Sequence, residues 1–183
     1  MNKRVIVLTG IIMMAAMARL VPHPPNVTPI GAMAVFGGVC FASRRMAYLL
    51  PLSAMLLSDV VLGCTRYGLL SLLAIQPVVY VCIAAATALG QLVNDRRSVW
   101  QVGMTTLAGS VLFFLITNFA TWAAGDLYPL TTSGLAECYR AAIPFFRNSL
   151  IGDAVFAAIL FGGLAWAEKR LAWMRENARP LSA

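Results

Sequence analysis

The sequence predicts an all-α integral membrane protein with six transmembrane helices and both termini in the cytoplasm. Two observations predict this fold. The 183 residues are 60% hydrophobic and only 11% charged, whereas soluble domains carry about 25% charged residues. The basic residues also gather in alternate gaps between apolar windows, as they do at the cytoplasmic ends of membrane helices. The composition excludes a soluble enzyme, a secreted disulfide scaffold and a disordered chain.

Six apolar windows divide the chain, which we expect to form one domain over residues 1–183. A transmembrane helix needs about 20 mostly apolar residues, with a range of roughly 17–25. The windows that reach or approach this length are residues 5–21, 29–42, 46–62, 68–92, 99–123 and 145–167.

The first window follows Lys3 and Arg4 and contains Ala16, Met17 and Ala18, a pattern that also fits a cleavable signal peptide. A multispan protein normally keeps its first helix as an uncleaved anchor, and this is the interpretation that we favour.

The second window is the weakest, because a helix over residues 31–42 rises only about 18 Å against a hydrocarbon core of about 30 Å. A re-entrant segment is the alternative. It would move Arg44 and Arg45 to the outer side and break the alternation of charge, so we expect a short or tilted span. Gly38 and Ala34, four residues apart, suit close packing against another helix.

The third, fourth and fifth windows are almost free of charge, with Asp59 in the third as the exception. The fourteen Lys and Arg residues then set the orientation. Ten fall on the side of the termini, namely Lys3, Arg4, Arg44, Arg45, Arg96, Arg97, Lys169, Arg170, Arg175 and Arg179. The other side holds Arg19, Arg66, Arg140 and Arg147. The basic excess marks the cytoplasmic side, and no excess charge remains to indicate nucleic acid as a partner.

The sixth window follows the longest connection, residues 125–146. Its second half has an apolar stripe at spacings of three and four, made of Leu135, Cys138, Tyr139 and Ala142. This spacing predicts an amphipathic helix on the outer surface that ends at Pro144. The segment is either an interfacial anchor or a lid that closes with the first outer loop over an outward-facing pocket.

The first outer loop, residues 19–29, has four prolines within eight residues and is expected to be rigid. It contains His23, the only histidine of the chain. A metal site needs several ligands, so we expect no metal. His23 is either structural or a ligand- or pH-sensitive contact.

Polar side chains in the outer half of the predicted bundle form the candidate substrate-binding site. Ionisable groups inside a membrane cost about 2.5–3.5 kcal/mol at mid-depth and mark functional sites by default. Asp59 and Asp153 are two such groups. The candidate residues are Arg19, His23, Asn26, Asp59, Asn118, Trp122, Tyr128, Tyr139, Asn148 and Asp153. The alternative is a structural pair of Arg19 with an Asp, together with hydrogen bonds between helices.

Catalysis has little support. The chain lacks a nucleophile-and-base spacing and a phosphate-binding loop, so we expect no enzyme, no catalytic residues and no cofactor. Asp59 and Asp153 as an acid–base pair are the enzymatic alternative. Cys64 and Cys138 lie on the predicted outer side and are a candidate disulfide.

Four ordered strings carry a resemblance to a known family. They are residues 19–26 (RLVPHPPN), 117–122 (TNFATW), 128–135 (YPLTTSGL) and 138–153 (CYRAAIPFFRNSLIGD). The chain resembles a family of small six-span bacterial membrane proteins of unknown function that are labelled transport proteins. That family is similar in size and layout to the substrate-binding (S) components of energy-coupling factor transporters. The first window lacks the small-xxx-small motif with which S components dock on their coupling subunit.

The resemblance implies a multi-pass protein of the bacterial cytoplasmic (inner) membrane. As its function we expect a specificity subunit that takes up a small solute, vitamin-like or another micronutrient, from the outer side. Its partners would be the lipid bilayer, a transmembrane coupling subunit and ATPase subunits that supply the energy. The alternatives are a membrane enzyme acting on a lipid or envelope precursor, and a structural or assembly protein.

Overall fold

The computed structural model describes residues 3–67, 76–94 and 98–171. The regular structure in these ranges is helical, without strands, which confirms the predicted all-α class. The helices are α1 (Lys3–Ala18), α2 (Ile30–Cys40), α3 (Arg44–Leu62), α5 (Gln76–Gln91), α6 (Val99–Ala124) and α7 (Thr132–Arg170). A π-helical turn, η1 (Gly63–Tyr67), extends α3. Residues 68–75, the start of the predicted fourth span, lie outside the described residues.

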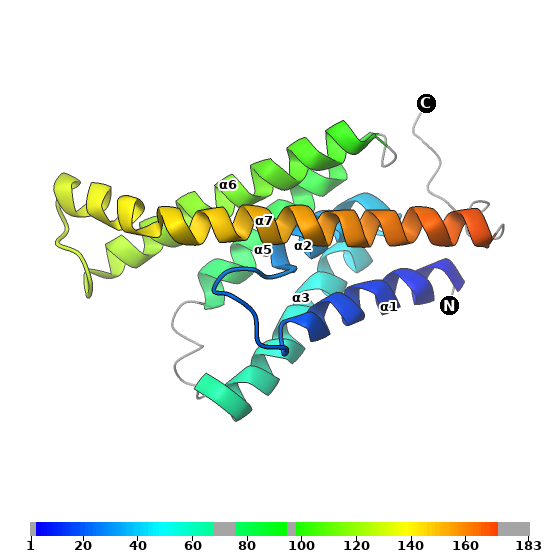
Figure 1. Ribbon diagram of the computed structural model, residues 1–183, viewed down its shortest axis with the longest axis horizontal. Coiled ribbons are helices and arrows are strands. Elements are labelled where there is room, and N and C mark those ends of the chain that lie inside the picture. The colour runs from blue at the N-terminus through cyan, green and yellow to red at the C-terminus, as the bar shows by residue number, and fades with distance from the viewer. Residues whose placement is uncertain (1–2, 68–75, 95–97, 172–183) are drawn as a thin grey trace.

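Successive helices alternate in direction through the bundle (Figure 1). Arg4 at the start of α1 pairs with Glu168 near the end of α7. Arg19, just after α1, pairs with Asp59 near the end of α3. The start of α1 and the end of α7 therefore lie at the same end of the molecule. This alternation is the arrangement that a chain crossing a bilayer back and forth requires.

The short helix α2 forms the centre of the bundle. All its residues from 32 to 40 are buried, and it contacts α1, α3, α5, α6 and α7. Glycine allows this packing, because a Cβ atom on Gly38 would overlap the carbonyl oxygen of Thr87 and the backbone of Gly90 on α5. The 11 residues of α2 rise only about 16 Å, so this helix is too short to cross a bilayer by itself.

Three helices within the described ranges are long and apolar enough to cross a membrane. They are α3 extended to Thr65, α6 and α7. Helices α2 and α5 are apolar but shorter, with 11 and 16 residues, and α1 has 16 residues. Length and composition thus support three of the six predicted spans.

Helix α6 is more polar on its buried side than on its exposed side. Its buried residues are Val102, Thr106, Gly109 and Ser110. Its exposed face carries large apolar side chains, namely Val99, Trp100, Met104, Leu107, Val111, Leu115 and Phe119. A surface helix of a soluble protein has the opposite polarity. The exposed face of α6 therefore has the composition of a face that contacts lipid.

The predicted surface helix and the sixth span form a single helix, α7, and the expected helix end at Pro144 is wrong. Proline removes one backbone hydrogen bond, but the turns on both sides of Pro144 supply enough others to continue the helix. Thr131 caps the start, because its side chain accepts a hydrogen bond from the Gly134 amide at 3.2 Å. The long predicted connection is thereby reduced to residues 125–131, which begin at Gly125 with a φ of 78°.

The first loop and the connection at residues 125–131 lie apart in the structure (Figure 1). The connection at residues 125–131 lies at the far end of the α6–α7 hairpin, whereas the first loop lies beside the middle of α7 (Figure 1). There the Asn148 side chain donates a hydrogen bond to the Pro25 carbonyl at 3.0 Å. Gly152, one turn further along α7, lies against the backbone of Thr28.

Candidate functional site

Five charged side chains are buried among the residues that the structure describes: Arg4, Arg19, Asp59, Asp153 and Glu168. Four of them form two ion pairs. Arg4 pairs with Glu168 and Arg19 pairs with Asp59, each at 2.9 Å. Asp153 belongs to neither pair and is held by uncharged donors instead.

Asp153 on α7 caps the start of the buried helix α2. Its Oδ1 accepts a hydrogen bond from the Ala32 amide at 3.0 Å, and its Oδ2 accepts one from the Ser110 hydroxyl at 2.6 Å. Helix α2 needs this cap, because Pro29 precedes it and provides no side-chain hydrogen bond. The carboxylate also stabilises the positive end of the helix dipole. Asp153 therefore joins α2, α6 and α7.

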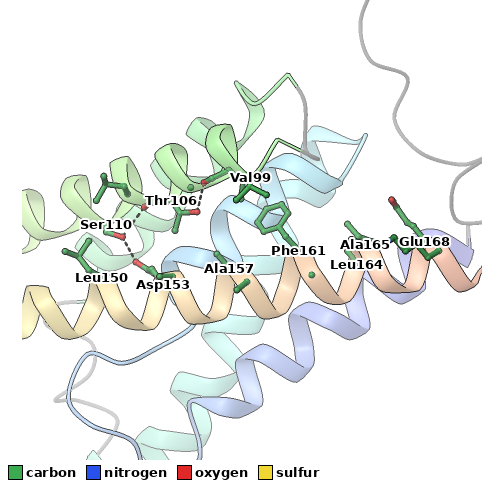
Figure 2. Close-up of a pocket in the computed structure, with 17 residues that line it drawn as sticks. Val99, Thr106, Ser110, Leu150, Asp153, Ala157, Phe161, Leu164, Ala165 and Glu168 are labelled. Atoms are coloured by element: carbon green, nitrogen blue, oxygen red, sulfur yellow. Dashed lines mark hydrogen bonds between the residues drawn. The ribbon is translucent and has the colours of Figure 1, made fainter.

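A groove of about 980 Å³ runs between α6 and α7 (Figure 2). It extends from Ser110 and Asp153 to Glu168 and Lys169. The groove exists because the two helices diverge toward the start of α6 (Figure 1) and because small residues face the gap. These small residues are Gly103, Ala154, Ala157, Ala158, Gly162 and Ala165. The groove is the candidate site.

The groove is apolar along most of its length. The Thr106 hydroxyl donates to the Val102 carbonyl at 2.9 Å, and the Ser110 hydroxyl donates to Asp153, so both hydroxyl protons are already used. The charged ends, Asp153 and Lys169, are sixteen residues apart on α7, which corresponds to about 24 Å along the helix. This arrangement can hold an elongated, mostly apolar molecule.

A second polar centre joins α1, α3 and α5. Arg19 Nη2 lies 2.9 Å from Asp59 Oδ1, and the Tyr80 hydroxyl donates to Asp59 Oδ2 at 2.9 Å. Arg19 also donates to the Ser58 hydroxyl. None of these four residues is among those that line the groove. The contacts are those of an ion pair that ties helices together, and they place Asp59 in a different centre from Asp153.

Two of the predicted site residues, Trp122 and Tyr139, stabilise the hairpin of α6 and α7, and a third, Asn118, bonds within α6. Trp122 Nε1 donates to the Pro129 carbonyl at 3.0 Å. The Tyr139 hydroxyl donates to the Leu115 carbonyl at 2.7 Å. The side-chain amide of Asn118 donates to a carbonyl of its own helix at 2.7 Å. These side chains satisfy backbone carbonyls and do not line the groove.

The remaining candidates lie in or beside the loops. His23 and Asn26 are exposed in the first loop, and Asn26 has a left-handed backbone with a φ of 63°. Asn148 holds that loop against α7 through its side-chain amide. Tyr128 is half-buried in the connection between α6 and α7. Of the ten candidates, Asp153 alone lines the groove.

The partners of Asp153 and the residues at the other end of the groove were not among the predicted site residues. Thr106 and Ser110 are four residues apart in an apolar window, and this spacing on one helix face is the signal that points to them. The Ala32 amide is a backbone group, so the residue types in the sequence do not identify it as a partner of Asp153. Lys169 was used only as one of the basic residues that predict the orientation in the membrane, although it lines the groove.

Residues 3–67, 76–94 and 98–171 contain no group of three His, Cys, Asp or Glu side chains able to hold a metal ion. Cys64 and Cys138, the candidate disulfide, are both free thiols. The Cys138 thiol instead donates to the Asn118 carbonyl at 3.4 Å.

Comparison with known proteins covers almost the whole chain but assigns no activity. A family model described as a family of unknown function (DUF6580) matches residues 1–177. No curated protein and no solved structure matches the chain. The resemblance to the S components of energy-coupling factor transporters therefore gains no support from these comparisons.

Proposed function

The chain belongs to this family of unknown function, and we propose that it is a membrane transport component that binds a small solute in the groove between α6 and α7. The observation that carries the proposal is the groove of about 980 Å³, with Asp153 at one end and Lys169 at the other. In this proposal six helices lie in the bacterial cytoplasmic membrane, and both termini face the cytoplasm.

The surface chemistry supports insertion into a bilayer. Helix α6 exposes large apolar side chains along its length, and α3, α6 and α7 are long enough to span. The exposed basic residues at one end of the bundle include Lys3, Arg44, Arg45, Lys169 and Arg170. These residues mark the cytoplasmic end under the positive-inside rule. The shorter helices α2 and α5 are surrounded by other helices or tilt within the bilayer.

Uptake against a gradient needs an energy source, and in this proposal other subunits supply it. The sequence has no phosphate-binding loop for ATP. In the proposed system, ATPase subunits supply the energy and a transmembrane coupling subunit connects them to the solute-binding chain.

The positions of the two carboxylates favour binding over catalysis. Asp59 is held by Arg19 and Tyr80, whereas Asp153 is held by the Ala32 amide and Ser110. Acid–base catalysis would need both carboxylates within reach of one substrate. Their separate partners support a binding role for the groove instead.

Two neighbouring glycines on α7 test the proposal. Gly162 lines the groove and Gly163 does not, although a Cβ atom on either would meet no other atom within 4 Å. We expect the parent protein, extracted with its native lipids, to retain a small molecule that native mass spectrometry detects. Gly162→Phe should fill the groove and lower that occupancy about tenfold, whereas Gly163→Phe should leave it unchanged. Equal occupancy in the two variants, or a parent protein without a retained molecule, contradicts the proposal.

A further inference from the structure

We propose that the ligand of the groove is an anionic membrane lipid, held with an acyl chain along α7 and its headgroup at Lys169. This inference rests on the groove that the proposed function uses as its binding site, and it assigns a membrane lipid, in place of a water-soluble solute, as the molecule that the groove holds. Three properties of the groove carry it: an apolar wall, a side open to the bilayer and a positively charged end.

The wall of the groove selects an extended apolar chain. Between its two ends it is lined by apolar side chains that include Val102, Leu107, Ala157 and Phe161. Sites for small polar molecules carry a few precisely placed polar groups that orient the ligand, whereas the only hydroxyl near the middle of this groove, that of Thr106, is bonded within α6. The groove is about 24 Å long. One leaflet contributes roughly 15 Å to the hydrocarbon core, so the groove is long enough for an acyl chain that spans a leaflet.

The groove is open on its side, along α7. Ala154, Ala158, Gly162 and Ala165 all line it and are all exposed. Their small side chains leave room for an acyl chain beside the helix. Because this side faces the hydrocarbon region in the proposed orientation, a lipid chain enters the groove sideways and needs no lid.

The end of the groove at Lys169 is positively charged. Lys169 is exposed and takes part in neither ion pair found among the described residues. Glu168 beside it is buried against Arg4 at 2.9 Å, so its negative charge is compensated. Helix α6 begins at the same end with Val99, and the start of a helix carries a partial positive charge. An anionic headgroup is therefore attracted to Lys169 and kept away from the carboxylate of Asp153.

Lipid titration of the full-length protein in detergent, followed by native mass spectrometry, tests the charge selectivity. The probes are phosphatidylglycerol and phosphatidylcholine with the same acyl chains. We expect the parent to bind phosphatidylglycerol about fivefold more tightly, the effect of one basic side chain on an anionic lipid. Lys169→Gln should abolish this preference, whereas Arg170→Gln should keep it, because Arg170 is also exposed but does not line the groove. Equal binding of the two lipids by the parent, or equal losses in the two variants, overturns the proposal.

Two controls separate this inference from the proposed function. Free glycerol phosphate should not displace bound phosphatidylglycerol, because it lacks the chain that fills the groove, and displacement would overturn the assignment to a lipid. If a different small molecule or a partner helix occupies the groove and is lost in Gly162→Phe, the lipid assignment fails while the groove remains a binding site. If Gly162→Phe loses nothing that the parent holds, both fail.

Discussion

Replacing Asp59 with leucine is expected to lower the free energy of unfolding by about 3–5 kcal/mol, because it leaves Arg19 charged and buried without its partner. Arg19 is 9% exposed and Asp59 is 4% exposed, so water cannot replace the lost carboxylate. The Tyr80 hydroxyl also loses its acceptor. The double variant Arg19→Met/Asp59→Leu should recover much of the loss, since apolar residues often replace a buried pair at little cost in stability.

Thermal unfolding in detergent micelles measures both variants against the parent. Asp126→Leu is the matched control, because Asp126 is exposed in the connection between α6 and α7, and its effect should stay within about 0.5 kcal/mol. The single variant Arg19→Met completes the cycle, and a double variant that loses as much as Asp59→Leu and Arg19→Met together would show that Arg19 and Asp59 are not energetically coupled.

Replacing Asp153 with alanine is expected to lower the free energy of unfolding by about 2–3 kcal/mol, because the Ala32 amide at the buried start of α2 loses its acceptor. Asparagine should behave differently at the same position. Its side-chain oxygen can accept from Ala32 and its amide can donate to the Ser110 oxygen, so Asp153→Asn should lose less than about 1 kcal/mol.

The rate of hydrogen exchange at the Ala32 amide reports directly on its hydrogen bond to Asp153. Exchange should be faster in Asp153→Ala and close to the parent rate in Asp153→Asn. If the two variants are equally destabilised, α2 depends on the negative charge of Asp153 rather than on its hydrogen bonds.

Much of the fold is predictable from hydropathy because helix position follows from runs of apolar residues. The fifth window, residues 99–123, corresponds closely to α6 at Val99–Ala124. The second window, residues 29–42, contains the short helix Ile30–Cys40. Pro144 misled the prediction of α7, because a proline weakens a helix locally without always ending it.

The candidate site was less predictable, for two physical reasons. Asp153 stands out as a carboxylate in an apolar window, but its main partner is a backbone amide of α2, which has no distinctive residue type. The groove arises from the divergence of α6 and α7 (Figure 1), and this angle depends on packing between helices rather than on the sequence of either one. Trp122 resembled a ligand because an aromatic group at a helix end serves hairpin contacts equally well. Asn118 resembled one because an amide side chain in a span equally well bonds a carbonyl of its own helix.

The claim that the α6–α7 groove holds a ligand is tested most directly by an experimental structure of the protein in nanodiscs of native lipid. We expect continuous ligand density along α7 from Lys169 toward Asp153 in the parent and in Gly163→Phe, and its absence in Gly162→Phe. Helices α6 and α7 packed against each other along this stretch, with no density between them in the parent, would contradict the binding site.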